Sequence, residues 1–353
     1  MAGVQAKPGN YTGNGGPATL AQLNAPLGVA LDSRGNIYIA DYSNNVVRKV
    51  NITTGIITTV AGQGPKQAQA GVNGIGGLAT SAQLYQPIGL YIDSSDNIYI
   101  ADGGGEQVKK IDHATKILSL IAGSPQGTLG NAGDGFLATG TNVQFHFPAA
   151  VQFTPNGDLY ILDIGASIVR KVDHLTGIIS TVYGNNRTQG YSGDGFVVTH
   201  TTDFVSTKFN VPRDMKFDAS YNLYIADSNN NAIRRIDHAT LIVTTVAGTG
   251  VAGSTGDGGL ATAAKLNSPR GIAFDSSGNY YITEYSGHRV RKVDIVTGII
   301  STVAGTGVSG YSGDGGFATN AKLNKPNGIV VHPSGYLIVA ENGNNVIRKI
   351  SFA

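Results

Sequence analysis

The 353-residue chain contains no cysteine, no tryptophan and only 2 methionines. The absence of cysteine excludes disulfide scaffolds, cysteine-ligated zinc or iron–sulfur sites and a cysteine nucleophile. Charged residues make up only 14% of the chain, and 25 basic residues nearly balance 23 acidic ones. A dedicated nucleic-acid-binding protein usually carries a large basic surplus. We therefore do not expect a nucleic-acid partner.

Several other signals are also missing. No apolar run reaches the ~18–20 residues that a membrane-spanning helix requires, so no membrane span is expected. The chain has only 12 prolines, and its glycines follow no three-residue period, which excludes a collagen-like protein. The sequence lacks a GxSxG turn, a phosphate-binding loop and the HxH or HExxH spacing of zinc sites. The sequence therefore contains no recognisable catalytic motif.

The chain does contain 50 glycines and a sequence motif that recurs from one end to the other. The first copy runs through PLGVALD (Pro26–Asp32), IYIAD (Ile37–Asp41), VVRKV (Val46–Val50) and IITTVAG (Ile56–Gly62), with short turns between these segments. Copies open 57 to 64 residues apart, each at a proline: Pro26, Pro87, Pro148, Pro212, Pro269 and Pro326. Because no interruption leaves room for a linker, we predict one domain over residues 1–353.

Each copy predicts four short β-strands. The segments alternate in polarity, are rich in β-branched and aromatic residues, and end in glycine, asparagine, aspartate or serine. Four-stranded units repeated radially form a β-propeller. The sequence therefore predicts an all-β, six-bladed propeller. Connections of about 20–27 residues join the copies, and ATSAQL and TNAKL within them favour a single helical turn.

The two ends of the sequence share one copy of the repeat. Met1-Ala2-Gly3 aligns with the end of a fourth strand, and the chain stops at Ile350–Ala353, just after a third strand. We therefore expect the sixth blade to close across the termini. Its outer strand should be short or missing, because the sequence begins inside a longer natural chain.

The repeated phrase PxG…D…GNxYIADxxNxxVRKV resembles the NHL repeat over essentially the whole chain. The matching residues are Gly35-Asn36, Tyr38, Asp41, Asn45 and Arg48 in the first copy and Gly278-Asn279, Tyr281, Glu284 and Arg291 in the fifth. The TVAGTG…GDGGxATxAxLNxPxG connection is similar to the form common in microbial proteins of this family. The resemblance implies a β-propeller fold. It does not imply one activity, since such propellers include RNA-binding, protein-binding, kinase-sensor and lyase members.

Two charged series recur with the repeat. Strand two ends in a carboxylate, at Asp41, Asp102, Asp163, Asp227, Glu284 and Glu341. Strand three carries a basic residue, at Arg48, Lys109, Arg170, Arg234, Arg291 and Arg348. Strand two lies one strand spacing, about 4.8 Å, outside the innermost strand, so these carboxylates stand too far from the axis to share one metal ion. We interpret them as turn caps or ion-pair partners of the basic residues; a cation site or a phosphate-binding surface is the alternative.

Metal and cofactor signals are weak. The turns at Asp134-Gly135, Asp194-Gly195, Asp257-Gly258 and Asp314-Gly315 contain one acid each and lack the further oxygen ligands of a calcium loop. Tight glycine turns explain them, and calcium is the alternative. His113, His174 and His238 fall in the same turn of different blades, so they should not converge on a metal. We expect no bound cofactor or metal.

The repeat loses its symmetry at the residue after the opening proline. This position is apolar in three consecutive copies and polar in the next three: Leu27, Ile88, Ala149, Arg213, Arg270 and Asn327. The fourth copy also has Asp214 where glycine is usual. Tyr191 and Tyr311 lie in connections on the same face and could stack on a sugar or pack against a partner. Drift between duplicated units is the alternative explanation.

We therefore expect a non-enzymatic binding scaffold that recognises a protein, peptide or glycan on the face carrying the long connections. Its candidate ligand-binding residues are Arg213, Asp214, Arg270, Asn327, Tyr191 and Tyr311. The alternative is a lyase or hydrolase that uses a cation with Asp214, Glu284 or His288; a purely structural unit is a third hypothesis. The composition, with no cysteine and low charge, favours an extracellular or periplasmic location, and we expect a monomer.

Overall fold

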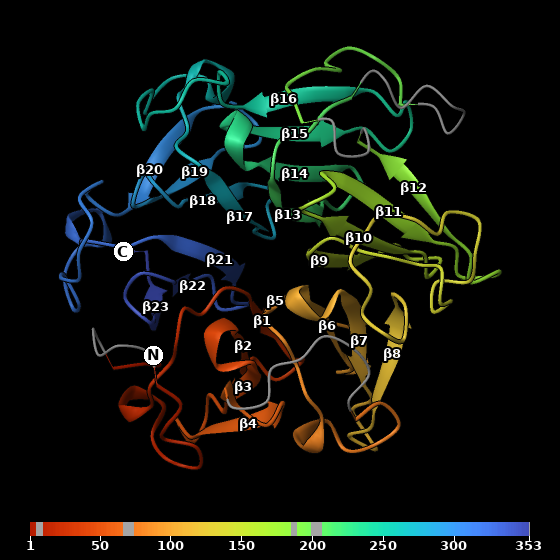
Figure 1. Ribbon diagram of the computed structural model, residues 1–353. Coiled ribbons are helices and arrows are strands. Elements are labelled where there is room, and N and C mark those ends of the chain that lie inside the picture. The colour runs from red at the N-terminus through yellow and green to blue at the C-terminus, as the bar shows by residue number, and fades with distance from the viewer. Residues whose placement is uncertain (5–9, 66–73, 185–188, 199–206, 353) are drawn as a thin grey trace. The chain divides into compact units, whose positions relative to one another are not determined.

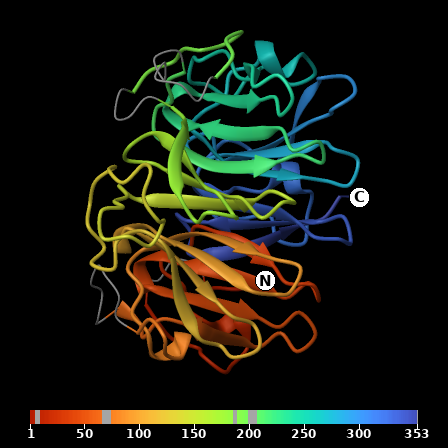
Figure 2. The same ribbon diagram turned by 90° about the vertical axis from the view of Figure 1, so that its right-hand side faces the viewer.

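The computed structural model describes residues 1–4, 10–65, 74–184, 189–198 and 207–352. Its strands form six antiparallel sheets, five with four strands and one with three among the described residues. These sheets are the blades of a six-bladed β-propeller, as the repeat predicted (Figure 1). Figure 2 shows strands of one blade lying side by side.

The strands of each blade follow one another in sequence from one edge of the sheet to the other. Blade one contains β1 (Val29–Leu31), β2 (Ile37–Asp41), β3 (Val46–Val50) and β4 (Ile57–Ala61). Blade two contains β5 (Pro87–Ile92), β6 (Ile98–Asp102), β7 (Gln107–Ile111) and β8 (Leu118–Ala122). Blade three contains β9 (Pro148–Phe153), β10 (Leu159–Asp163), β11 (Ile168–Val172) and β12 (Ile179–Tyr183).

The other three blades repeat this order. Blade four contains β13 (Pro212–Phe217), β14 (Leu223–Asp227), β15 (Ala232–Ile236) and β16 (Val243–Ala247). Blade five contains β17 (Pro269–Phe274), β18 (Tyr280–Glu284), β19 (Arg289–Val293) and β20 (Ile300–Ala304). Blade six contains β21 (Pro326–Val331), β22 (Leu337–Glu341) and β23 (Val346–Ile350).

Blade six lacks a regular outer strand among the described residues, as predicted. Ala2 pairs with Ile347 of β23 through two backbone hydrogen bonds, Ala2 N–H to Ile347 O at 3.3 Å and Ile347 N–H to Ala2 O at 2.8 Å. This single bridge brings the N-terminal segment to the position that Ala61 occupies against Val47 in blade one. The sheet therefore closes across the two ends of the chain.

Short 3₁₀ helices lie at two recurring places. One kind follows strand two, at η2 (Tyr42–Asn44), η5 (Gly103–Gly105) and η6 (Ser228–Asn230). The other lies in the connections, where the sequence predicted a helical turn, at η1 (Ala18–Leu20), η4 (Ala79–Ser81), η7 (Ala261–Ala263) and η8 (Ala318–Asn320). Among the described residues, no helix has the length and hydropathy needed to cross a membrane.

The chain divides into two compact units. The first comprises residues 1–166, 170–181 and 340–348, and the second comprises residues 167–169, 182–339 and 349–353. In each unit, neighbouring blades share an apolar core. In the second unit, Tyr224 and Ile233 of blade four pack with Ile272, Tyr280 and Ile300 of blade five. The candidate ligand-binding residues all belong to this second unit.

Candidate functional site

Arg213 and Arg270 lie at equivalent places on β13 and β17, the innermost strands of two neighbouring blades (Figure 1). Each follows a proline that pairs with the end of strand two. Beyond that proline the register shifts, between Pro212 and Met215 in β13 and between Pro269 and Ile272 in β17. Such β-bulges turn side chains away from the regular alternation of a strand. Both arginines therefore lie in irregular backbone next to another blade.

In blades five and six, the residue before the opening proline anchors the innermost strand to the preceding blade. Ser268 has a φ of 51°, and its N–H donates to Asn231 Oδ1 at 3.0 Å. Lys325 has a φ of 53°, and its N–H donates to His288 Nδ1 at 3.2 Å. These contacts fix the point at which β17 and β21 begin, and with it the position of the residue after each proline.

The guanidinium of Arg270 stacks on the ring of Tyr285. Its Cζ lies 3.3 Å from the ring centroid, and Lys325 Nζ lies 5.6 Å from the same centroid. A cation over an aromatic face is stabilised by the ring quadrupole. The Nε of Arg270 is buried and has no hydrogen-bond partner among the described residues. Tyr285 thus orients the guanidinium without neutralising it.

Arg270 also feels the charge of Arg213. Burial, and then the nearby positive charge of Arg213, lower the pKa of Arg270 to about 10. At neutral pH it therefore remains protonated. Two half-buried guanidinium groups thus repel each other at the start of β13 and β17. A bound anion would relieve this repulsion, because it would interact favourably with both.

Asp214 is the acidic residue that follows Arg213 in the sequence. Backbone N–H groups donate hydrogen bonds to both of its carboxylate oxygens. Oδ1 accepts the N–H of Met215 at 2.9 Å, and Oδ2 accepts the N–H of Ile272 at 3.0 Å. Lys216 Nζ lies 3.9 Å from Oδ1. Burial raises the pKa of Asp214, while Lys216 and the two N–H groups oppose this rise. The carboxylate therefore fastens β13 to β17.

Most other blades have glycine at the position that Asp214 occupies in blade four, because the neighbouring inner strand lies close to it. A Cβ added to Gly271 would collide with the backbone oxygen of Asn327, and one added to Gly28 would collide with that of Ile88. At these places neighbouring inner strands approach closely. In blade four, the side-chain bond from Asp214 to Ile272 joins the neighbouring strands instead.

Asn327 lies on β21, beside β17. Its carbonyl accepts the hydroxyl of Thr283 at 2.5 Å, and Thr283 Oγ1 in turn accepts the N–H of Gly271 at 2.7 Å. The half-buried Asn327 side chain follows Pro326 as Arg270 follows Pro269. Arg213, Arg270 and Asn327 thus lie at the same place on three successive inner strands.

The two connection tyrosines lie elsewhere. The Tyr191 hydroxyl is 2.8 Å from Thr245 Oγ1 on β16, the outermost strand of blade four, and Arg234 lies over its ring. The Tyr311 hydroxyl donates to Asp314 Oδ2 at 2.7 Å. Since β16 is three strand spacings from β13, roughly 14 Å, Tyr191 lies at the opposite edge of the sheet from Arg213. Tyr285, which is not among the candidate ligand-binding residues, is the aromatic residue that contacts Arg270.

The carboxylates that end strand two are structural, as we interpreted them. Glu284 lies 3.5 Å from Arg291 Nη1 and accepts the N–H of Asn267 at 2.9 Å. Burial raises the pKa of Glu284 to about 7, while Arg291 opposes this rise. The other members also bond to the turn before their blade or to the basic residue on strand three, at Asp41, Asp102, Asp163, Asp227 and Glu341.

The acid of the Asp-Gly turns has a partner that sequence analysis missed. Asp257 Oδ1 accepts from Arg291 Nη2 at 2.5 Å, and Asp194 Oδ1 accepts from Arg234 Nη2 at 2.8 Å. Asp134 binds Arg170 in the same way at 2.6 Å. The sequence held only a partial signal. The acid occurs in copies that carry arginine on strand three, and the second copy has Ile75 with Lys109, but the first copy has Asn14 with Arg48.

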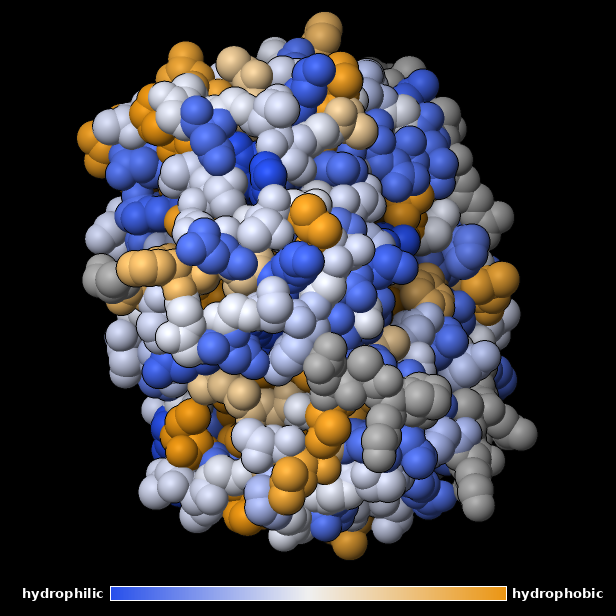
Figure 3. Space-filling view, turned by 90° about the vertical axis from the view of Figure 1, so that its left-hand side faces the viewer, coloured by the Kyte–Doolittle hydropathy of each residue, from blue (hydrophilic) through white to orange (hydrophobic). Residues whose placement is uncertain are grey.

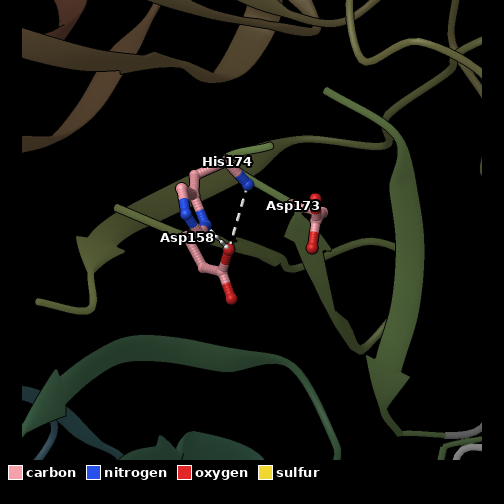
Figure 4. A group of neighbouring side chains, drawn as sticks. All are labelled: Asp158, Asp173 and His174. Carbon is pink, nitrogen blue, oxygen red and sulfur yellow. Dashed lines mark hydrogen bonds and ion pairs between the residues drawn. The ribbon is translucent and has the colours of Figure 1, made fainter. Parts of the chain in front are cut away.

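One group of potential metal ligands lies in the first unit, among the described residues. Asp158, Asp173 and His174 each offer an atom within 4.8 Å of the others (Figure 4). Asp158 is already engaged, because its Oδ1 lies 2.8 Å from His174 Nδ1 and its Oδ2 lies 3.0 Å from Lys171 Nζ. Lys171 supplies the positive charge that a cation would bring.

The chain is similar to known proteins over nearly its whole length. The family profile of the teneurin NHL domain matches residues 2–73, 64–240 and 249–310. The chain belongs to the NHL-repeat family. Relatives of this NHL-repeat chain include SUPPRESSOR OF QUENCHING 1, chloroplastic, from Arabidopsis thaliana, 28% identical over 93% of the chain and 30% of that protein. Human Teneurin-1 is 28% identical over 95% of the chain and 12% of its own length.

A third relative of the NHL-repeat chain is NHL repeat-containing protein 2 from Gallus gallus, 27% identical over 80% of the chain and 40% of that protein. The chain thus spans less than half the length of these curated relatives. Solved structures share the fold. An auxiliary nutrient binding protein from Bacteroides thetaiotaomicron has a TM-score of 0.67 at 16% identity, covering 99% of this chain and 75% of that one. A streptogramin B lyase has a TM-score of 0.54 at 13% identity, covering 99% and 98%.

Proposed function

We propose that the chain is a non-enzymatic binding module that recognises a protein, peptide or glycan ligand at the start of β13, β17 and β21. The residues that bind are Arg213 and Arg270, with Asn327 beside them and Tyr285 beneath Arg270. The observation that carries this proposal is the pair of half-buried guanidinium groups, close enough for one to lower the pKa of the other.

The charge of the site favours a ligand with an anionic group. A guanidinium stacked on a ring keeps its N–H groups in its own plane, directed away from the aromatic face. That geometry suits a carboxylate, phosphate or sulfate, which accepts two parallel hydrogen bonds from arginine. A ligand bearing such a group would offset the repulsion between Arg213 and Arg270. Asn327 would add a neutral donor and acceptor for an adjoining amide or hydroxyl group.

The names of similar folds agree with a binding role without establishing it, since some are described as nutrient-binding proteins and others as lyases. The alternative is a metal-assisted lyase or hydrolase that uses Asp214, Glu284 or His288. Asp214 and Glu284 already bond to backbone N–H groups, and His288 Nδ1 accepts the N–H of Lys325. We therefore favour binding, with no cofactor, in an extracytoplasmic monomer.

The test is a screen of arrayed acidic and neutral peptides and glycans against three proteins. Wild type should bind a set enriched in carboxylate, phosphate or sulfate groups. Arg213→Ala with Arg270→Ala should lose this set by at least tenfold, whereas Arg34→Ala with Lys116→Ala, which removes two exposed cations, should keep it. An unchanged set in the first double variant would refute the site. A stoichiometric amount of metal retained by the protein after dialysis would favour the alternative, a metal-assisted lyase or hydrolase.

A further inference from the structure

A cleft between blades four and five lies entirely within the second unit. It has a volume of about 440 Å³, which is within the range of small-molecule pockets. Side chains of both blades line it: Tyr224, Arg235 and Thr245 of blade four, and Leu260, Tyr280 and Val293 of blade five. None of the candidate ligand-binding residues belongs to this lining. The cleft is therefore a separate place on the second unit.

The repeat changes at two positions that line this cleft. The fourth residue of strand three is arginine in blade four, at Arg235, and lysine in the other blades: Lys49, Lys110, Lys171, Lys292 and Lys349. The first residue of strand two is tyrosine in blade five, at Tyr280, and Ile or Leu in the other blades. Both exceptions line the same cleft although they belong to different copies of the repeat.

In other blades, the tyrosine of strand two bonds to the acid of the turn before it. In blade one, the Tyr38 hydroxyl donates to Asp32 Oδ2 at 3.3 Å, and Lys49 Nζ lies 3.0 Å from the same oxygen. Lys49 also lies over the Tyr38 ring, 5.0 Å from its centroid. Similar tyrosine–aspartate bonds occur in blades two and five, from Tyr99 to Asp93 and from Tyr281 to Asp275. The lysine and the acid together satisfy the tyrosine hydroxyl in blade one.

Blade four lacks this arrangement. Arg235 Nη2 donates to Asp237 Oδ2 at 2.8 Å, in the turn that follows its own strand. No described residue bonds to the hydroxyl of Tyr224, the counterpart of Tyr38. The Nε of Arg235 is buried and has no hydrogen-bond partner among the described residues. Burial and the negative charge of Asp218 raise the pKa of Tyr224, so its hydroxyl keeps its proton and can donate.

Aromatic rings form an apolar part of the lining. The ring centroids of Tyr224 and Tyr280 lie 5.4 Å apart, and the Tyr280 hydroxyl donates to Val246 O at 3.1 Å. This hydrogen bond fixes the Tyr280 ring against blade four. Planar aromatic molecules pack favourably against such rings, edge-on or offset.

The surroundings favour a small molecule over a protein partner. Figure 3 shows the side of the molecule that carries β20, with separate hydrophobic patches among hydrophilic residues. A protein interface would require a continuous surface of several hundred Å² on each partner. A cleft of this volume instead suits a ligand that enters between the two blades.

The charges of the lining favour a neutral ligand. Asp218 and Asp294 both line the cleft, and each carboxylate accepts the N–H of a residue in its own turn, Asn222 at 2.9 Å and Thr297 at 2.8 Å. These two carboxylates repel an anion, and the guanidinium of Arg235 repels a cation. A neutral oxygen acceptor avoids both costs and can accept from a hydroxyl or a guanidinium.

We propose that the cleft between blades four and five binds a neutral, planar, bicyclic aromatic molecule that carries a carbonyl oxygen. Its rings would pack against Tyr224 and Tyr280, beside Leu260 and Val293. Its carbonyl oxygen would accept from the Tyr224 hydroxyl and from Arg235.

The test uses prodan, a neutral naphthalene ketone whose fluorescence shifts to shorter wavelength in apolar surroundings. Titration of the full chain into prodan should show saturable binding at one site per chain. Neutral 2-acetonaphthone should displace the bound prodan. The anion 2-naphthoate and the cation 2-naphthylmethylammonium should each displace it at least tenfold less effectively.

Three variants locate the binding site. Tyr224→Phe removes only the hydroxyl that no described residue bonds, and it should weaken prodan binding about fivefold. Tyr38→Phe, the same change in blade one, is the matched control and should leave binding unaltered. Arg235→Lys should weaken binding at least tenfold, because a lysine here would reach Asp218 and cover Tyr224, as Lys49 does with Asp32 and Tyr38.

Several outcomes would overturn the proposal. These are no saturable binding of prodan, equal displacement by the three naphthalene competitors, and equal effects of Tyr224→Phe and Tyr38→Phe. Stronger displacement by the ammonium than by the ketone would assign the cleft to cations instead. The proposal does not rest on Arg213 or Arg270, so the double alanine variant of that site should bind prodan as wild type does.

Discussion

The second unit contains two kinds of buried arginine, which differ in what neutralises them. Arg234 and Arg291, on the third strands, are fully buried, and each contacts two carboxylates. Arg213 and Arg270, on the innermost strands, are half-buried, and the groups that face Arg270 are Arg213, the Tyr285 ring and Lys325. The same side chain is thus paired with carboxylates in one place, and in the other, at Arg270, it faces like charge and an aromatic ring.

The difference separates arginines that belong to the scaffold of the blade from arginines that are candidates for ligand binding. The third-strand arginines recur with their acids, so their pairing belongs to the scaffold of the blade. The innermost arginines appear only where the repeat loses its symmetry, and the oxygens of the neighbouring Asp214 accept N–H groups of β13 and β17. An arginine cannot shed its charge at neutral pH. A bound anion would therefore be a favourable partner for Arg270, which faces Arg213 and Lys325.

The largest expected effect comes from breaking the scaffold pair. Arg291→Met should lower the free energy of unfolding by about 3–5 kcal/mol, because Glu284 and Asp257 would lose their buried partner. Equilibrium urea unfolding followed by circular dichroism measures this change. Ligand binding at Arg213 and Arg270 should persist in the folded fraction. A loss below about 1 kcal/mol would show that the buried pair behaves like an exposed one and would weaken the comparison.

The second prediction concerns a buried acid of the first unit, which can lose its charge as an arginine cannot. Glu106 Oε2 accepts the N–H of Phe147 at 2.6 Å, and burial, aided by Asp163 and Asp102, raises the pKa of Glu106 to about 8 from 4.5. Between pH 4.5 and 8 the folded state therefore keeps a proton that the unfolded state has released. Stability must fall as pH rises through this window.

Glu106→Gln should remove this loss, because the amide oxygen still accepts from Phe147 and carries no charge. The variant should exceed wild type by about 2 kcal/mol in unfolding free energy at pH 8, with a smaller difference at pH 5. Asp112→Asn is the matched control, since the pKa of this exposed carboxyl is lowered by its bonds to Thr115 and its charge does not change in that window. Parallel pH profiles for Glu106→Gln and wild type would contradict the shift.

The smallest effect is expected at the innermost arginines. Arg213→Ala should leave the free energy of unfolding within about 0.5 kcal/mol of wild type, or raise it, because it removes a like charge from Arg270. The same urea titrations compare it with Arg291→Met. A destabilisation above about 2 kcal/mol would place Arg213 in the scaffold and erase the distinction between the two kinds of arginine.

Sequence patterns predicted the fold because every copy of the repeat carries the same strand and turn signals. Alternation in IYIAD and VVRKV, turns at Gly35 or its equivalents, and six opening prolines all point to the same four-stranded unit. Even the incomplete blade six was predictable, since Ala2 aligns with Ala61. Local periodicity is sufficient where every unit makes the same contacts.

The candidate site was only partly predictable. Arg213 and Arg270 were found because they break the repeat, whereas Tyr285 had no signal that separated it from Tyr191 or Tyr311. Its stacking on Arg270 depends on how the turn after β18 lies beside the start of β17, which periodicity does not encode. Asp214 was likewise a candidate ligand-binding acid from the sequence. The structure shows that its two oxygens accept the N–H groups of Met215 and Ile272.

The most direct measurement is isothermal titration of citrate, a small tricarboxylate, into three proteins at low ionic strength. The account predicts one site per chain in wild type and in Arg34→Ala with Lys116→Ala, and no measurable site in Arg213→Ala with Arg270→Ala. Equal heats and stoichiometry in all three proteins would contradict the claim that the innermost arginines of the second unit form an anion-binding site.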